Sequence, residues 1–512
     1  MDATIRFKER MALLLAILSS GIVFLDQTAL NVAIPAIQNS FDANINAIQW
    51  IHNIYLLVLS VLMLIGGILG DIFGRVRMYI IGMAIFIVAS ALCGIAPSVG
   101  WLIAGRFLQG VGGAIVAPAG LAIINAVVAT ERRGQALGTW GTFAPLITIS
   151  GPIIGGWLVD NASWRTVFFI NLPLGLIAIF IAARYVPENR NDQVSRKLDY
   201  WGVVTLMLAL GGLLIALIEG PERGWDNPLI AYSLITGAVG FVAFLYVESH
   251  VDSPLIPLSL FRNRMFSGVN ILTVVLFMGL GGPFFFLTLN LQQVQGYSAT
   301  LAGLAALPSA VAIFLLSRQV GKLSDRIGPR PILIAAFCLM ATGFLLLLRP
   351  GVGDPYWTHW FPGLLVYGVG IAGMVVPLTS MGLGVLPRRQ SGIASGINNA
   401  ASRIGQMLSV AVFGAAMVNR FQSRLAAWTV PLNLPADVRE TLLEQARSLG
   451  ETVPPAGISA ETQAIIDRLI KLAFVDSFRL VMVWSVILVV ISLGILLLTI
   501  PHEMPTHEGA DA

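Results

Sequence analysis

The sequence has very little charge for its length. Of its 512 residues only 11% are Asp, Glu, Lys or Arg, whereas 56% are apolar. Soluble domains carry about 25% charged residues, so this chain has too few charges to cover a water-facing surface of its size. This scarcity excludes a soluble enzyme, a disordered chain and a nucleic-acid-binding domain. The lipid bilayer is therefore the expected solvent.

Cysteine and histidine are scarce as well. Cys93 and Cys338 both lie inside apolar runs, so they indicate neither a disulfide framework nor a metal site. The five histidines are scattered, and no acidic pair has the spacing of metal ligands, which argues against a membrane-embedded transferase. The sequence also lacks the Gly-rich Lys-Ser/Thr motif of ATP-driven proteins. We therefore expect no metal, no cofactor and no enzymatic activity.

Long apolar runs recur from end to end of the sequence. Fourteen segments reach the ~20 residues that a helix needs to cross a bilayer. The first is too long and too polar at its centre to be a cleaved signal segment. The sequence therefore predicts an all-α membrane protein with spans at 11–37, 46–70, 77–97, 100–128, 134–159, 164–186, 199–220, 228–248, 263–294, 298–325, 329–349, 357–386, 391–420 and 472–500.

Basic residues are distributed unevenly between the connecting segments. Nineteen lie in segments on the side of the N-terminus, whereas Arg165, Arg223 and Arg349 are the three in the short loops opposite. Lys and Arg gather on the cytoplasmic side of membrane proteins, so both termini are expected in the cytoplasm. The long segment 421–471 is then outside, as a surface cover; a gate or a partner site is the alternative. We expect this segment to hold two short helices, 435–449 and 459–471, the second capped by Ser459.

One short motif occurs twice in the sequence. Residues 67–75 read GILGDIFGR and residues 321–330 read GKLSDRIGPR, so Gly, Leu, Asp and Gly recur at the same spacing. Internal repeats with a binding site at their interface are typical of transporters. The motif predicts an N-terminal six-helix half at 1–186, two inserted helices at 199–248 and a C-terminal six-helix half at 263–500.

The residues of this motif suit a tight turn between two helices, and we expect them to act in conformational change. Gly74 allows a positive φ, and Gly67 allows another helix to approach closely. Asp71 is placed to accept hydrogen bonds from the N-terminus of a neighbouring helix. Arg75 completes the first copy, and Asp325 is the counterpart of Asp71 in the second.

Asp26 is the most informative residue because it lies in the middle of the first span, ~24 Å along the helix from its inner end. A carboxylate at such a depth is costly and usually functional. Arg106 in the fourth span lies within reach of Asp26, and Gln109 follows one turn later on the same face. We expect Asp26 and Arg106 to form the proton-coupling site; a purely structural ion pair is the alternative.

Several further polar side chains lie inside the spans and are candidates for a substrate cavity. For Arg403 two alternatives stay open, lining the cavity or bonding to backbone carbonyls. A structural role for His52 is favoured over proton transfer. The expected cavity residues are Asn31, His52, Tyr55, Gln109, Asn398 and Arg403.

Six segments together resemble the fourteen-helix drug:proton antiporters of the major facilitator superfamily. The resemblance covers nearly the whole chain, and its segments occur in the order and on the side that the family requires. Basic residues usual in the family are replaced by Ile72 and Val76, and Ile147 replaces a Gly. The segments are LDQTALNVAIP (25–35), GILGDIFGRVR (67–77), LIAGRFLQGVGGA (102–114), SGPIIGGWL (150–158), SWRTVFFINLPLG (163–175) and GYSATLAGLAALP (296–308).

The resemblance implies proton-coupled efflux of amphipathic, often cationic drugs or toxic compounds across the cytoplasmic (inner) membrane. Its partners would be small molecules, protons and the bilayer, with a periplasmic adaptor left open. It implies that Arg106 acts on the protonation of a nearby carboxyl, and that Gly151, Pro152 and Gly155 mark exporters that exchange cargo against protons. These glycines would also let a second helix pack at backbone distance. Export of a lipid, a siderophore or a self-made antibiotic by the same fold is the alternative.

Overall fold

The computed structural model describes residues 2–188, 198–384, 391–446, 449, 452–455 and 458–500. In this part of the chain every regular element is helical. Thirteen helices, some of them joined end to end, are long and apolar enough to cross a membrane. The 32-residue helix α5 (Thr130–Asn161) lies where the sequence predicts the remaining span. The all-α membrane fold expected from the sequence is confirmed.

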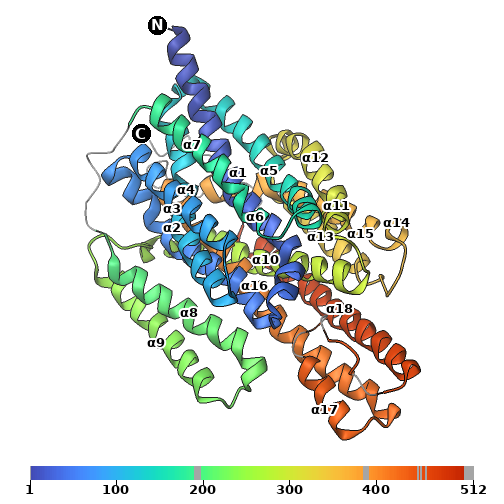
Figure 1. The fold of residues 1–512 in the computed structure, drawn as a ribbon. Helices are drawn as coiled ribbons and strands as arrows, with labels where there is room; N and C mark the ends of the chain where they lie inside the picture. Colours follow the sequence, from blue (N-terminus) through green and yellow to red (C-terminus); the bar gives the residue numbers. More distant parts are fainter. Residues whose placement is uncertain are drawn as a thin grey trace.

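The spans follow one another with short connections (Figure 1). The first six are α1 (Asp2–Phe41), α2 (Ile45–Phe73), α3 (Arg75–Gly94), α4 (Val99–Val127), α5, and α6 (Thr166–Phe169) with α7 (Asn171–Tyr185). Next come α8 (Tyr200–Arg223) and α9 (Pro228–His250). The last six are α10 (Arg264–Leu289), continued by a π-helical turn (Asn290–Val294); α11 (Ala299–Ala305) with α12 (Leu307–Ile327); α13 (Pro329–Leu346); α14 (Tyr356–His359) with α15 (Phe361–Gly384); α16 (Ser391–Thr429); and α18 (Ala460–Thr499).

Polar residues at the connections fix where many helices begin. The side chain of Asn44 accepts a hydrogen bond from the backbone N–H of Ala47, 2.9 Å away. Ser98, Asp199, Asn227, Asn263 and Ser298 cap other helices in the same way. Such caps satisfy N–H groups that have no partner within the helix. The short polar connections therefore set the register of the long apolar helices.

The same pairs of helices pack in the first and the last six spans. α1 packs on α5, while α2 and α3 pack on α4; correspondingly, α10 packs on α16, while α12 and α13 pack on α15. Gly74 and Gly328, at equivalent places in the repeated motif, each separate two helices and have φ of +104° and +84°. Glycine adopts this region at little cost, which explains the residue at both turns.

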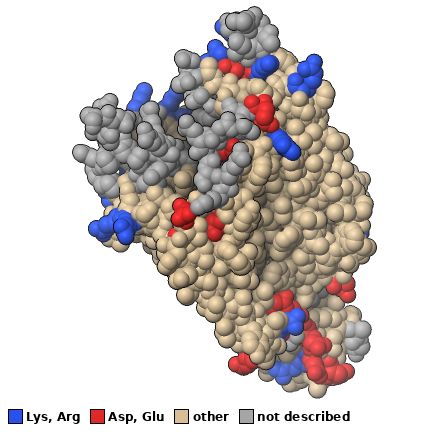
Figure 2. All heavy atoms as spheres, turned by 90° about the vertical axis from the view of Figure 1, so that its left-hand side faces the viewer, with Lys and Arg blue, Asp and Glu red and all other residues tan. Residues whose placement is uncertain are grey.

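The pair α8 and α9 lies beside the bundle, where α8 contacts α2 and α16 (Figure 1). Its outward surface carries large exposed apolar side chains, among them Trp201, Tyr232 and Phe241. Figure 2 views this side and shows charged residues towards the two ends of the molecule with an uncharged belt between them. A belt of this kind is suited to the hydrocarbon core of a membrane.

Two helices extend further than the sequence predicts. α16 continues to Thr429, and α18 begins at Ala460, so the separate short helix expected at 459–471 is wrong. Ser459 does cap α18, accepting from the N–H of Thr462. Arg420 and Arg424 of α16 both bind Asp476 of α18, at 2.7 and 2.9 Å. These ion pairs join the helices, and α17 (Ala436–Gln445) lies between them at the bottom of Figure 1.

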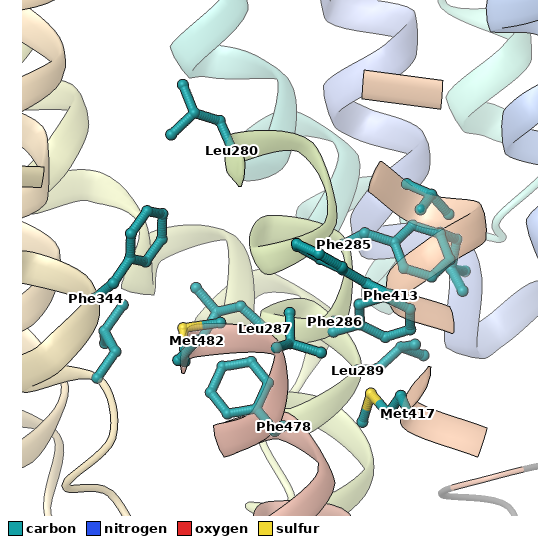
Figure 3. Close-up of a cluster of buried hydrophobic side chains, with 14 of the residues drawn as sticks. Leu280, Phe285, Phe286, Leu287, Leu289, Phe344, Phe413, Met417, Phe478 and Met482 are labelled. Atoms are coloured by element: carbon teal, nitrogen blue, oxygen red, sulfur yellow. The ribbon is translucent and has the colours of Figure 1, made fainter. Parts of the chain in front are cut away.

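The largest buried apolar cluster contains residues of both groups of six spans, and Figure 3 shows the part around α10. Phe285 and Phe286 of α10 lie beside Phe413 of α16, and Phe478 and Met482 of α18 lie on the other side of α10. The rings of Phe285 and Phe286 meet edge to face, with centroids 4.9 Å apart. This packing holds α10, α16 and α18 together around the centre of the molecule.

Candidate functional site

A buried ion pair lies at the centre of the first six spans. Nη1 of Arg106 on α4 is 2.5 Å from Oδ2 of Asp26 on α1, and both side chains are at most 1% exposed. Gln109 donates to Oδ1 of Asp26 at 2.8 Å and accepts from Arg106. Both carboxylate oxygens of Asp26 therefore have partners, as a charge in a low-dielectric interior requires.

Two further residues complete this network. Asn171 donates to Oδ1 of Asp26 at 2.8 Å, and Ser90 of α3 accepts from Gln109 and from Asn171. Asn171 is the first residue of α7, which packs against α1 and α3. Sequence reasoning missed both residues. The available signal was an Asn within the apolar run FFINLPLG; Ser90 carries no comparable signal.

Arg106 makes two further contacts, both with α2. Its Nε donates to the carbonyl oxygen of Ile51 at 3.3 Å, and its guanidinium lies 4.2 Å from the centroid of the Tyr55 ring. Residues of α1, α2, α3, α4 and α7 thus form the network around the Asp26–Arg106 pair.

Arg403 on α16 lies in a second polar cluster. Its Nη1 donates to Oε1 of Gln27 at 2.8 Å and to Oε1 of Gln406 at 3.3 Å. Its guanidinium also lies 4.8 Å from the centroid of the Phe24 ring. Of the two alternatives left open for Arg403, bonds to backbone carbonyls do not occur among the described residues, where Arg403 binds side-chain amides. Gln27 and Gln406 were not predicted from the sequence.

The other expected cavity residues lie on three helices and do not form one cluster. His52 of α2 is 5% exposed and meets the edge of Phe285, with centroids 5.4 Å apart. Asn398 of α16 donates to Thr273 of α10 at 2.9 Å. Asn31 of α1 is half-buried. The carbonyl oxygen of the Asn31 side chain and Nδ1 of His52 have no hydrogen-bond partner within the described residues.

The first copy of the repeated motif forms a local ion pair. Arg75 binds Asp71 at 2.7 Å and donates to the carbonyl oxygen of Ala122 on α4. The N-terminus of α3 is occupied by Glu188, which accepts from the N–H groups of Val76 and Arg77. The expectation that Asp71 would accept from a helix N-terminus is thus wrong for this copy. The longer reach of Glu188 fills that position from another segment.

The close helix contact expected at Gly67 is wrong by one residue. A methyl group at Gly67 would have ordinary van der Waals contact, whereas one at Gly66 would collide with the carbonyl oxygen of Ala114. Gly66 therefore faces α4 at backbone distance. The side chain of Asp325, in the second copy of the motif, lies outside the described residues.

The glycines of α5 lie against two neighbouring helices. A side chain at Gly151 would collide with Thr28 of α1, and one at Gly155 would come within 2.8 Å of Ala29. On another face, the carbonyl oxygen of Pro152 lies against Gly303 of α11. The expected packing at backbone distance therefore occurs, and it extends from the first six spans to the last six.

Apart from the bonds of Gln27 at the centre, the hydrogen bonds that the described residues form between the first and last six spans lie at one end of the bundle. Asp160, at the end of α5, accepts from the N–H groups of Ala299 and Thr300 at the start of α11, at 3.1 and 2.8 Å. Gln292 donates to the carbonyl oxygen of Val32, and Gln293 donates to Gln38. This is the end where α1 and α5 finish, so the two groups of helices meet there.

The family model of the Major Facilitator Superfamily matches residues 16–410. The chain belongs to this superfamily. It is 34% identical over 425 residues to "Multidrug resistance protein Stp" of Mycobacterium tuberculosis (strain CDC 1551 / Oshkosh), which covers 81% of this chain and 76% of the relative. It is 33% identical over 439 residues to "Tetracenomycin C resistance and export protein" of Streptomyces glaucescens, covering 85% and 81%.

A solved structure supports the same fold. A bacterial homologue of the human lysosomal transporter Spinster, in an inward-facing and unoccupied conformation, superposes with a TM-score of 0.63 at 17% identity. The match covers 98% of this chain and 99% of the other. The chain is thus a multi-pass membrane protein with the fold of a superfamily of transporters.

Proposed function

We propose that this protein exports amphipathic, often cationic drugs or toxic compounds across the cytoplasmic membrane in exchange for protons. Its relatives include proteins named for multidrug resistance and for antibiotic resistance and export. The observation that carries the coupling step is the buried Asp26–Arg106 pair in the middle of the bundle. We further propose that transport involves no chemical reaction of the cargo.

The geometry suggests how protons would be coupled to cargo. Asp26 can hold either its ion pair with Arg106 or a proton, and these two states change the charge of a buried site by one unit. A change of charge in the low-dielectric interior alters which arrangement of the surrounding helices has the lower free energy. Proton binding from outside and release to the cytoplasm would therefore drive the two six-helix halves between their arrangements.

Dye transport tests this proposal directly. Inside-out vesicles containing the protein should accumulate ethidium when their lumen is made acidic, and nigericin, which collapses the pH gradient, should abolish the accumulation. Asp467→Asn, which removes a surface ion pair with Lys471 within α18, serves as a matched control. Accumulation that persists after the gradient is collapsed would rule out proton antiport.

The distribution of basic residues supports both termini in the cytoplasm. The helix end that carries Asp160 and α17 would then be outside. After Cys93 and Cys338 are replaced by Ser, a cysteine at the exposed position Glu440 should react with an impermeant thiol reagent in intact cells. A cysteine at the exposed position Arg77 should react only in broken cells. The reverse pattern would overturn this orientation.

We propose that the Asp71–Arg75 pair acts in conformational change and does not carry protons. The pair is partly exposed at the inner end of α2, where water already reaches it, so protonation there would store little gradient energy. Asp71→Asn should slow exchange several-fold, while equilibrium ethidium binding stays at the wild-type value. Loss of binding in a correctly folded variant would contradict this role.

Export of a self-made antibiotic is a second candidate, because one relative is named for export as well as resistance. It requires the same fold and the same coupling site, and differs only in the cargo. Competition of a panel of antibiotics with ethidium for the purified protein distinguishes the two candidates. A narrow specificity for one compound would favour this alternative, and broad competition would favour multidrug efflux.

A further inference from the structure

A second cation lies at the centre of the molecule, and the proposed coupling step does not use it. Arg403 is only 9% exposed. In the described part of the chain, Arg106, Arg420 and Arg424 each form an ion pair with a carboxylate, whereas Arg403 forms no ion pair. Burying a charge without a counter-ion is costly. Arg403 is therefore a site where an anion would gain free energy.

The neutral partners of Arg403 leave most of its donors unused. A guanidinium carries five N–H groups in a planar fork. Two of them, on Nη1, bind the side-chain oxygens of Gln27 and Gln406. Nε2 of Gln27 also donates to Oε1 of Gln406 at 3.2 Å. The other three have no hydrogen-bond partner among the described residues. They can bind the two oxygens of one carboxylate.

The residues around Arg403 are not fully buried. Phe24, Gln27 and Gln406 keep part of their surface exposed although they lie in the middle of long helices at the meeting point of α1 and α16. Gln27 and Gln406 offer hydrogen bonds, and Phe24 offers an apolar face. An amphipathic molecule with one charged end can use all of these groups.

We propose that the unused N–H groups of Arg403 bind a carboxylate, or another anionic oxygen group, of the cargo, while its apolar body packs against Phe24. The inference rests on the proposed function and narrows its substrate class to amphipathic compounds that carry such a group. A zwitterion with an aromatic cation fits both descriptions. Asp26 does not supply this anion, because Arg106, Gln109 and Asn171 already occupy its oxygens.

Two dyes that differ only at the carboxylate provide the test. Rhodamine B carries a free carboxylate, and its ethyl ester does not. Their binding to the purified protein in lipid nanodiscs is followed by fluorescence anisotropy, without a proton gradient. The wild type should bind rhodamine B about tenfold more tightly than the ester, the size of one charge-assisted hydrogen bond. Arg403→Gln should abolish this preference, with the affinity for the ester unchanged.

Two variants make the result specific. Arg403→Lys keeps the charge without the fork and should retain part of the preference. Lys471→Gln removes a cation of α18 that already has a partner in Asp467, and it should retain all of the preference. An equal loss of affinity for both dyes in Arg403→Gln would show that Arg403 only joins α1 to α16, and this result would overturn the proposal. Equal binding of the two dyes by the wild type would also overturn it.

These measurements separate the anion site from the transport function. Because binding is measured at equilibrium, a preference for rhodamine B that depends on Arg403 would stand even if vesicles showed no gradient-driven efflux. Conversely, efflux of the ester with no preference for the carboxylate would leave proton antiport intact and reject the anion site.

Discussion

The two buried arginines at the centre of the molecule have opposite surroundings. Arg106 binds a carboxylate, a carbonyl oxygen and a side-chain amide, and all of its partners belong to the first six spans. Arg403 has no carboxylate, and its bond to Gln27 crosses from the last six spans to the first. One cation is thus neutralised within a group of helices, and the other joins two groups through neutral side chains.

This difference suggests a division of tasks. Contacts within a group of helices can persist when the groups move as rigid bodies, whereas contacts between the groups must break and form again in each cycle. A fully paired ion pair suits the first role, because breaking it without protonation is costly. Amide hydrogen bonds, whose net contribution is about 1 kcal/mol each, suit the second.

The largest effect is expected from Asp26→Asn, which removes the group that can titrate. The variant keeps the size of the side chain and one acceptor for Asn171 or Gln109. We expect it to reach the membrane and to lose gradient-driven ethidium accumulation in inside-out vesicles, because no proton can be exchanged at the site. Wild-type accumulation by this variant would show that Asp26 is structural.

The two arginines should also differ in how much they contribute to the free energy of unfolding. Arg106→Gln leaves Asp26 as an uncompensated buried carboxylate and should lower this free energy by about 3–5 kcal/mol. Arg403→Gln leaves every carboxylate paired and should lower it by about 1 kcal/mol or less. Thermal unfolding of the purified proteins should therefore rank Arg106→Gln far below Arg403→Gln. The double variant Asp26→Asn with Arg106→Gln should recover much of the stability. Equal unfolding temperatures for the two single variants would remove the distinction.

The fold could be predicted from the sequence because the apolar runs in a membrane protein are long and its polar loops short. The pairing of Asp26 with Arg106 could also be predicted, since few partners exist for a charge at that depth. Contacts made by neutral residues could not. The contact of Asn171 depends on how α7 approaches α1, and that of Gln27 depends on how α16 approaches α1. The extent of α18 was missed because its first turns are polar and resemble a separate surface helix.

A moderate effect is expected where the link between the two groups of helices is weakened. Gln27→Ala removes one acceptor of Arg403 and the bond from Gln27 to Gln406. Each bond contributes about 0.5–1.5 kcal/mol, so rhodamine B binding should change by up to about tenfold while the Asp26–Arg106 pair stays intact. Thr342→Ala, which removes a bond within α13 alone, is the control. A loss of ethidium transport as complete as in Asp26→Asn would mean that the two arginine sites are not separate.

The smallest effect is expected at the outer end of the bundle, where Asp160 of the first six spans caps α11 of the last six. Its carboxylate accepts from the first two N–H groups of α11, so this cap exists only while the two groups of helices meet there. Removing a cap costs about 0.5–2 kcal/mol. Asp160→Ala should therefore shift the equilibrium between the closed and the open outer end towards the open one by about two- to thirtyfold. In a protein whose native cysteines are replaced by Ser, a cysteine at the partly buried Ala36 should then react faster with an impermeant thiol reagent. Because the cap lies far along α5 from the central pair, equilibrium ethidium binding to a given arrangement should not change. Unaltered thiol reactivity would show that the close backbone contact of Gly303 with Pro152 holds the outer end closed without the cap.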